Sequence, residues 1–142
     1  MQESGPPQTN GVAPAVDLRA PADTAQLSEI RRRVRAYVAE AGGGDDVADD
    51  LELVVSELAT NVIEHTSSPT LTVRVEKTLD HWILDVADVD DLSILDHVEL
   101  PNATEVTGRG LFVVASLVDN VRIIDDGGRH AVRCSRQVSR SS

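Results

Sequence analysis

Three polar residues recur at intervals of four in the middle of the sequence: Glu57, Asn61 and His65. In a helix this spacing places the three side chains on one face, each about one turn from the next. A carboxylate and an amide oxygen one turn apart suit a hard cation that keeps some of its waters. The ridge is therefore a candidate cation or ligand site.

The ridge lies on a predicted helix that is capped by Asp45 or Asp46 and continues to about Thr66. Its apolar stripe consists of Val47, Leu51, Val54, Val55, Leu58 and Val62. At 100° per residue, His65 lies about 30° and Asn61 about 70° from the centre of that stripe, and Glu57 lies on its shoulder. Unpaired burial of such groups costs about 1–3 kcal/mol each. Backbone groups, neighbouring side chains or a bound ligand must therefore satisfy them.

A second candidate is Asp88, at the end of a predicted strand over residues 82–88. By strand alternation its side chain shares a face with Trp82, Leu84 and Val86. A carboxylate at this position could accept a hydrogen bond from an amino group of a ligand. An Asp that caps the following turn fits the pattern equally well.

A third candidate is the segment Gly108-Arg109-Gly110, which opens an apolar helix predicted to reach Val118. A helix N-terminus presents N–H groups and a positive dipole to an anion, and an arginine adds a charged fork suited to phosphate. Glycines on both sides of an arginine also occur in flexible hinges. The preceding stretch, 89–107, has weak periodicity, and a loop of that length is usually functional or disordered.

The remaining pattern predicts one α+β domain over residues 15–138, with a disordered leader at 1–14 and a disordered tail at 139–142. A strand at 15–20 precedes a helix whose apolar positions run from Leu27 to Ala41 and which ends at three glycines. Strands at 71–76 and 82–88 follow the second helix, and strands at 121–124 and 131–138 follow the third. This order predicts a mostly antiparallel sheet with helices on one face.

The formal net charge is −11, which disfavours nucleic acid and anionic membranes as direct partners. A basic protein, or a nucleotide held by local donors and a divalent cation, remains compatible with this charge. The single cysteine, Cys134, cannot form an intramolecular disulfide, and no apolar run is long enough for a membrane span. These features predict a cytoplasmic protein.

Taken in order, the three candidate segments resemble the motifs of the GHKL ATP-binding domains. The segment Glu57-Leu-Ala-Thr-Asn61-Val-Ile-Glu-His65 is similar to the N-box, Asp88 to the adenine-contacting aspartate, and Gly108-Arg109-Gly110-Leu111 to the glycine-rich box. In its short length and in the residue sequence of these motifs, the chain resembles the branch of anti-sigma-factor serine/threonine-protein kinases. The resemblance implies a two-layer α/β sandwich of the Bergerat type, with residues 89–107 as a lid over the ATP site.

The resemblance also implies roles for individual residues. Asn61 would coordinate Mg²⁺, Glu57 would be the general base toward a serine or threonine hydroxyl, and Asp88 would accept the adenine amino group. Gly108, Arg109, Gly110 and Leu111 would form the phosphate-binding end of the site. The implied partners are a sigma factor, a STAS-domain anti-sigma factor antagonist as the phosphorylation substrate, and a second copy of the chain in a homodimer.

One feature departs from the family pattern. The usual D-x-G-x-G reads Asp88-Val89-Asp90-Asp91-Leu92 here, with neither glycine. We expect Val89 and Asp90 to narrow or reshape the adenine pocket, and the added carboxylates to repel the nucleotide unless Mg²⁺ intervenes. The alternative function is therefore a catalytically inactive anti-sigma binding module with the GHKL fold.

Overall fold

The computed structural model describes residues 14–97, 109–126 and 129–138. Its strands are β1 (Val16–Pro21), β2 (Thr70–Lys77), β3 (His81–Ala87), β4 (Asn120–Asp126) and β5 (Arg129–Gln137), and its α-helices are α1 (Leu27–Glu40), α2 (Asp45–His65) and α3 (Arg109–Leu117). Two 3₁₀ segments, η1 (Thr24–Gln26) and η2 (Leu92–His97), complete the described elements. Within these residues, no helix combines the length and the apolar character that crossing a membrane requires.

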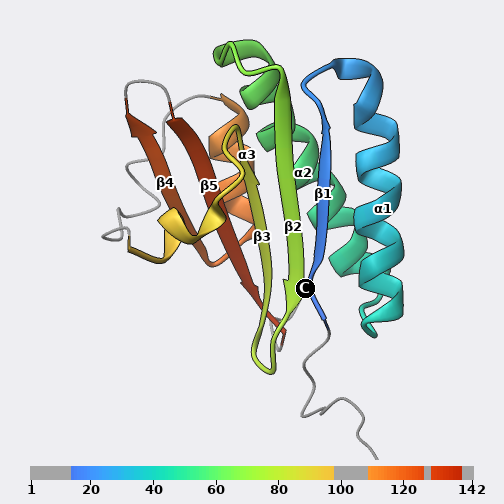
Figure 1. Ribbon diagram of the computed structural model, residues 1–142. Helices are drawn as coiled ribbons and strands as arrows, with labels where there is room; N and C mark the ends of the chain where they lie inside the picture. The colour runs from blue at the N-terminus through green and yellow to red at the C-terminus, as the bar shows by residue number, and fades with distance from the viewer. Residues whose placement is uncertain (1–13, 98–108, 127–128, 139–142) are drawn as a thin grey trace, which may run out of the picture.

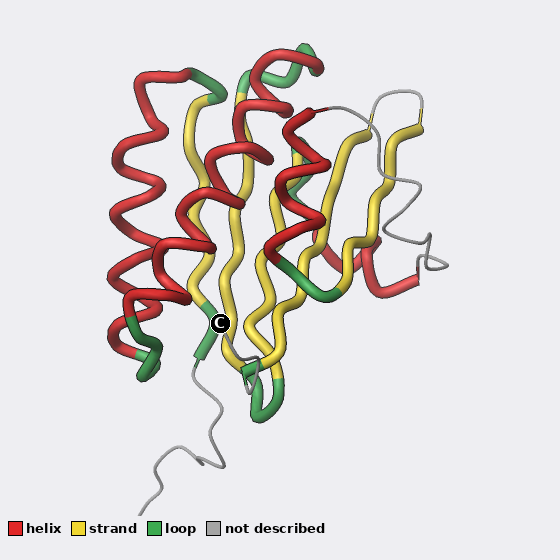
Figure 2. The backbone as a smooth tube through the Cα atoms, turned by 180° about the vertical axis from the view of Figure 1, so that it is seen from behind, coloured by secondary structure: helices red, strands yellow, loops and turns green. Residues whose placement is uncertain are grey.

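The strands form a five-stranded antiparallel sheet in the order β1-β2-β3-β5-β4. The three α-helices cover one face of this sheet, and η2 lies against the other (Figures 1 and 2). The predicted α+β two-layer sandwich is therefore confirmed. We call the face away from the α-helices the open face.

The start, the buried face and the end of helix α1 can each be explained by local residues. The carboxylate of Asp23 accepts a hydrogen bond from the backbone N–H of Ala25 at 2.9 Å, which starts η1 and then α1. Ile30, Val34 and Val38 recur at helical spacing and are buried. The helix gives way to Gly42 at φ +91°, a left-handed conformation that favours glycine.

Helix α2 begins one residue earlier than its charged residues suggested. Its N-cap is Gly44, so Asp45 and Asp46 stand in the first turn instead of capping it, where their charge complements the helix dipole. Of the predicted apolar stripe, Leu51, Val54, Val55, Leu58 and Val62 are buried, and Val47 in the first turn is partly buried against the same core. The helix ends at His65.

Several separate segments meet at one end of the molecule. Helix α2 runs up to this end, β3 finishes there, α3 begins there, and β4 and β5 turn there (the upper end in Figure 1). Helices α2 and α3 therefore pack antiparallel, with the start of α3 beside the last turns of α2. This topology brings the predicted site segments into one region.

Gly43 offers a test of the packing between the α1–α2 connection and the sheet. A Cβ atom at this position would lie 2.5 Å from a Val38 methyl and 2.9 Å from the Trp82 ring. We therefore expect Gly43→Ala to lower the free energy of unfolding by about 1–3 kcal/mol, as overpacking typically does. Urea unfolding followed by circular dichroism measures the change.

Gly44→Ala is the matched control, because nothing lies within 4 Å of a Cβ at that position. It should cost less than about 1 kcal/mol, a helix-cap effect only. Equal losses in the two variants would contradict the packing described for Gly43.

Candidate functional site

A pocket of about 380 Å³ opens at the end of the molecule where these segments meet. We call it the helix-side pocket. Its described lining comes from the end of α2 and the segment after it, from the residue that follows β3, and from the β4–β5 hairpin: His65, Thr66, Ser67, Ser68, Asp88, Asp125, Arg129 and His130. Two of the sequence-predicted site residues, His65 and Asp88, therefore share one pocket.

Asp88 is held in place by two hydrogen bonds to the backbone of His130. Its N–H donates to the His130 carbonyl at 2.9 Å, and its Oδ1 accepts from the His130 N–H at 2.8 Å. The prediction that Asp88 caps the following turn is therefore wrong, because the carboxylate bonds across to β5. Within the described residues, no bond is recorded for Oδ2, which leaves an acceptor in a pocket-lining side chain.

The segment after α2 is fixed by its own hydroxyl groups. Thr66 Oγ1 donates to the Val62 carbonyl at 2.8 Å, which satisfies a carbonyl at the helix end. Ser68 Oγ donates to the Thr70 carbonyl at 2.7 Å and contacts the Asp88 carbonyl at 3.4 Å. Ser68 therefore connects the segment after α2 to Asp88, and both residues line the helix-side pocket.

The polar ridge on α2 lies nearer the surface than the periodicity indicated. Glu57 and Asn61 are half-buried and His65 is exposed, so the predicted burial of His65 near the centre of the apolar stripe is wrong. Val54, Val55 and Leu58 form the centre of the buried face of α2, and the ridge lies at the edge of that face. No side-chain hydrogen bond is recorded for Glu57, Asn61 or His65 within the described part of the chain. Protein groups therefore do not satisfy the ridge there.

The three segments predicted to form the site are not all brought into the helix-side pocket. Asn61 lies one turn and Glu57 two turns before His65 on α2, and the described lining includes neither of them. Helix α3 begins at Arg109, and its backbone is helical through Gly110 and Leu111. Gly108 falls outside the described residues, as do residues 98–107 of the predicted lid.

The first part of the predicted lid takes an unexpected course. Asp90 extends to the open face, where its carboxylate pairs with Arg19 at 2.8 Å and accepts a hydrogen bond from Thr72 at 3.4 Å. The prediction that this carboxylate repels phosphates in the pocket is therefore wrong, since the sheet lies between them. The expected narrowing of the pocket by Val89 is also wrong, because Val89 packs in a cluster with Ala87 and Leu95.

Segment η2 is anchored to the open face by both apolar and ionic contacts. Leu92, Ile94 and Leu95 join the cluster that includes Ala131 and Ile124. Asp96 accepts a hydrogen bond from Arg133 at 2.6 Å. Sequence reasoning treated 89–107 as one loop and missed this element, although three apolar residues in four are a signal for a packed turn.

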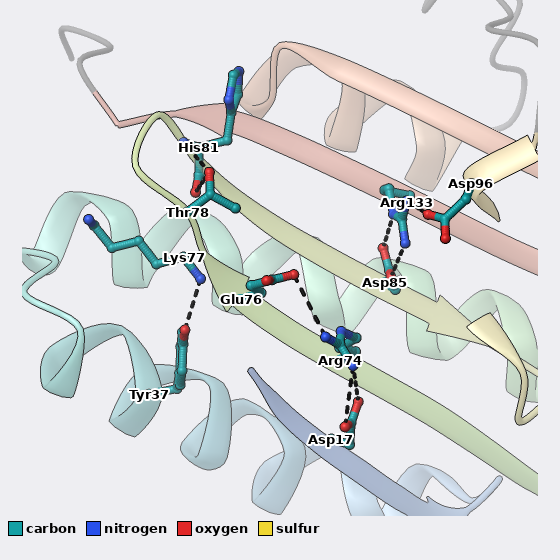
Figure 3. Close-up of polar contacts among 10 residues, drawn as sticks. All are labelled: Asp17, Tyr37, Arg74, Glu76, Lys77, Thr78, His81, Asp85, Asp96 and Arg133. Atoms are coloured by element: carbon teal, nitrogen blue, oxygen red, sulfur yellow. Dashed lines mark hydrogen bonds and ion pairs between the residues drawn. The ribbon is translucent and has the colours of Figure 1, made fainter. Parts of the chain in front are cut away.

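Sequence reasoning also missed a buried charge pair beneath η2. Asp85 is 1% exposed and receives two hydrogen bonds from Arg133, at 2.8 and 2.9 Å (Figure 3). Burial raises the pKa of Asp85, and the bonds and charge of Arg133 oppose that rise. Arg133 therefore joins β3, β5 and η2 into one unit on the open face.

Residues 20–136 match the family model described as the histidine kinase-like ATPase domain. The chain belongs to this family. It is similar to the serine-protein kinase RsbW of Bacillus licheniformis, at 26% identity over 80% of this chain and 79% of that protein. The corresponding RsbW of Staphylococcus aureus is also 26% identical, over 80% of each chain.

Two solved structures share the fold of this histidine kinase-like ATPase domain. The structure of the RsbU and RsbW domains of Rv1364c from Mycobacterium tuberculosis aligns with a TM-score of 0.69 and 18% identity; the match covers 92% of this chain and 34% of that longer one. The SiaB–SiaC complex from Pseudomonas aeruginosa aligns with a TM-score of 0.60 and 13% identity, covering 91% of this chain and 92% of the other. Both confirm the architecture.

The Asp85–Arg133 pair of this ATPase-family domain gives a sharp stability prediction. Arg133→Met leaves a buried carboxylate without its main partner, and we expect a loss of about 3–5 kcal/mol in the free energy of unfolding. Adding Asp85→Leu to that variant should restore most of the loss. Chemical denaturation of both variants measures the recovery.

Arg74→Met is the matched control on the same face, because Arg74 and its partner Asp17 are 38% and 60% exposed. Its expected cost is below about 1 kcal/mol. If Arg133→Met were as mild as Arg74→Met, the pair would not anchor the open face.

Proposed function

We propose that this domain is an ATP-dependent serine/threonine-protein kinase that binds ATP in the helix-side pocket. The observation that carries the proposal is the position of Asp88. Its carboxylate lines the pocket, is oriented by the His130 N–H, and keeps one oxygen without a recorded protein partner within the described residues. An acceptor fixed in this way suits the exocyclic amino group of adenine, reached directly or through one water.

In the proposed site, Asn61 holds Mg²⁺. Its amide is half-buried on α2 and makes no recorded bond to the described protein, so its oxygen is available to a hard cation that retains most of its waters. The ion would neutralise phosphate charge, which phosphoryl transfer requires. The start of α3, with Gly108, Arg109, Gly110 and Leu111, would supply N–H groups and a positive helix end to the phosphates.

Glu57 is the proposed general base. It lies one turn before Asn61 on the same side of α2, is half-buried, and has no recorded partner among the described residues. A carboxylate in this position can accept the proton of a serine or threonine hydroxyl as the oxygen attacks the terminal phosphate. Neither Arg31 nor Arg35 neutralises it, because these residues bond to Ser56 and to Asp49 along the other side of α2.

The similarity to RsbW serine-protein kinases supports a role in partner switching. The domain would sequester a sigma factor. It would also phosphorylate a STAS-domain antagonist, which in the phosphorylated form would not release the sigma factor from the domain. We place this activity in the cytoplasm and expect a homodimer. These partners are proposed from the similarity to the relatives, and ATP binding can be tested without them.

A second candidate function is a binding module that has lost phosphotransfer. The observation that favours it is the course of residues 89–96, which lack both motif glycines and are fastened to the open face by Arg19 and Arg133. If this segment must leave the sheet for catalysis, those contacts oppose the movement. The two candidates differ in phosphotransfer and share the anti-sigma role.

Nucleotide binding is the first measurement. Isothermal titration with Mg²⁺ and ATP should show binding to the unmodified domain, and Asp88→Ala should weaken it about tenfold or more through loss of a buried hydrogen bond. Asn61→Ala should weaken binding only when Mg²⁺ is present. Glu64→Ala, an exposed position on the same helix, is the control and should change nothing.

Absence of binding at millimolar ATP would eliminate the kinase and leave the binding module. Equal affinity in Asp88→Ala and the unmodified domain would instead mean that the nucleotide occupies another site.

Phosphotransfer separates the two candidates. With radiolabelled ATP and a STAS-domain protein, Glu57→Gln should lower the transfer rate by about 10²–10⁴-fold, the usual contribution of a general base. Its ATP affinity should stay within about twofold of the unmodified domain. A Glu57→Gln variant that still transferred phosphate at the normal rate would remove Glu57 from the proposed mechanism.

A further inference from the structure

Five charged residues stand opposite one another across the whole sheet on its open face. The strand registers align Asp17 of β1 with Arg74 of β2, Arg74 with Asp85 of β3, Asp85 with Arg133 of β5, and Arg133 with Arg122 of β4. We call these five residues the charge row. Its first four members alternate in sign, and neighbouring opposite charges pair, as Figure 3 shows for Asp17 with Arg74 and for Asp85 with Arg133.

The alternation fails at the last step. Arg122 lies directly opposite Arg133, and like charges in facing positions of a sheet are destabilising. Arg133 is already occupied by two carboxylates, Asp85 and Asp96. The recorded hydrogen bond of Arg122 is a 3.5 Å contact to the Leu95 carbonyl, the outer limit for such a bond. Among the described residues, no carboxylate pairs with Arg122.

A cleft of about 310 Å³ lies beside this mismatch on the open face. We call it the cationic cleft. Its described lining contains basic, neutral polar and apolar side chains but no acidic one: His81, Ile83, Asn120, Arg122, Arg133 and Ser135. Arg133 is paired with Asp85 and Asp96, so Arg122 is the arginine of this lining that has no carboxylate partner among the described residues.

We propose that the cationic cleft binds a short, extended, carboxylate-bearing segment of a protein partner. A carboxylate beside Arg122 supplies the anion that the charge row lacks. Asn120 and Ser135 offer amide and hydroxyl groups to the peptide backbone, and the half-buried Ile83 offers an apolar contact between them. A wide acidic surface would be repelled by the net charge of the domain, so a narrow segment fits better than a broad interface.

This cleft is independent of the proposed nucleotide site. The helix-side pocket and the cationic cleft lie on opposite faces of the sheet, and they share none of their described lining residues. A partner in the cleft would also touch the strand that carries Arg133, the residue that anchors η2. The contact therefore adds an interaction surface that the kinase site does not require.

The test uses fluorescence anisotropy at low ionic strength with a fluorescein-labelled peptide that has glutamate at every second position and a central leucine. The full-length unmodified chain should bind this peptide, and a peptide with serine in place of glutamate should not bind. Arg122→Gln should weaken binding about tenfold, the scale of a charge-assisted pair. Arg122→Lys should retain most of the affinity.

Arg32→Gln is the matched control, because Arg32 is an exposed arginine on α1 that pairs with Glu29. It removes the same charge and should leave peptide affinity unchanged. Thermal unfolding should show that Arg122→Gln is as stable as the unmodified chain or more so, since it relieves the facing pair of arginines. Asn61→Ala should bind the peptide normally even if it has lost ATP.

Four outcomes would overturn the proposal. They are no binding by the unmodified chain, equal weakening by Arg122→Gln and Arg32→Gln, displacement of the peptide by equimolar inorganic phosphate or by ATP, and a change in oligomeric state caused by Arg122→Gln in sedimentation. The third outcome would indicate a small-anion or nucleotide site, and the fourth an interface between copies of this chain.

Discussion

The alternation of side chains along β3 is the constraint on which the rest of the site depends. Period-two geometry sends Leu84 and Val86 toward the helices and sends Asp85 toward the open face. Asp88, just past the strand, continues the first set and lines the helix-side pocket. One strand therefore positions a ligand-facing carboxylate on one side of the sheet and a structural carboxylate on the other.

The two carboxylates differ because their partners differ. Asp85 is enclosed and receives two bonds from Arg133, so its acceptor capacity is largely consumed by the fold. Asp88 receives one backbone N–H, which orients it without neutralising it. A similar contrast holds among the arginines, since Arg35 of α1 pairs with carboxylates of α2, whereas Arg122 has no carboxylate partner among the described residues.

The residues that follow Asp88 show how an unusual motif can be accommodated. Where glycines would let the backbone pass close to a base, this chain has Asp90 and Leu92. Asp90 is satisfied by Arg19 and Thr72, and Leu92 packs against the open face. The substitution therefore does not place a carboxylate in the pocket. It gives the segment a fixed position on the sheet, and any closure over a nucleotide would have to work against these contacts.

Sequence patterns predicted most of the fold, since aliphatic periodicity marked α1 and α2 and alternation marked the strands. They failed where long-range partners decide the outcome. The register that pairs Asp85 with Arg133, and the course of η2, follow from contacts between residues far apart in the chain. Periodicity predicted partial burial for Glu57 and Asn61, which are half-buried, and overestimated the burial of His65, because the helix ends there. The roles of Glu57, Asn61 and the α3 start remain predictions.

Amide hydrogen exchange with and without Mg²⁺ and ATP tests the central claim, that the nucleotide binds on the helix side of the sheet at Asp88. We expect slower exchange in residues 61–68 and 129–131 when the nucleotide is added, with little change in residues 72–76 of β2, which do not line the pocket. Unchanged exchange around the helix-side pocket, with slowing confined to the strands and segment of the open face, would contradict it.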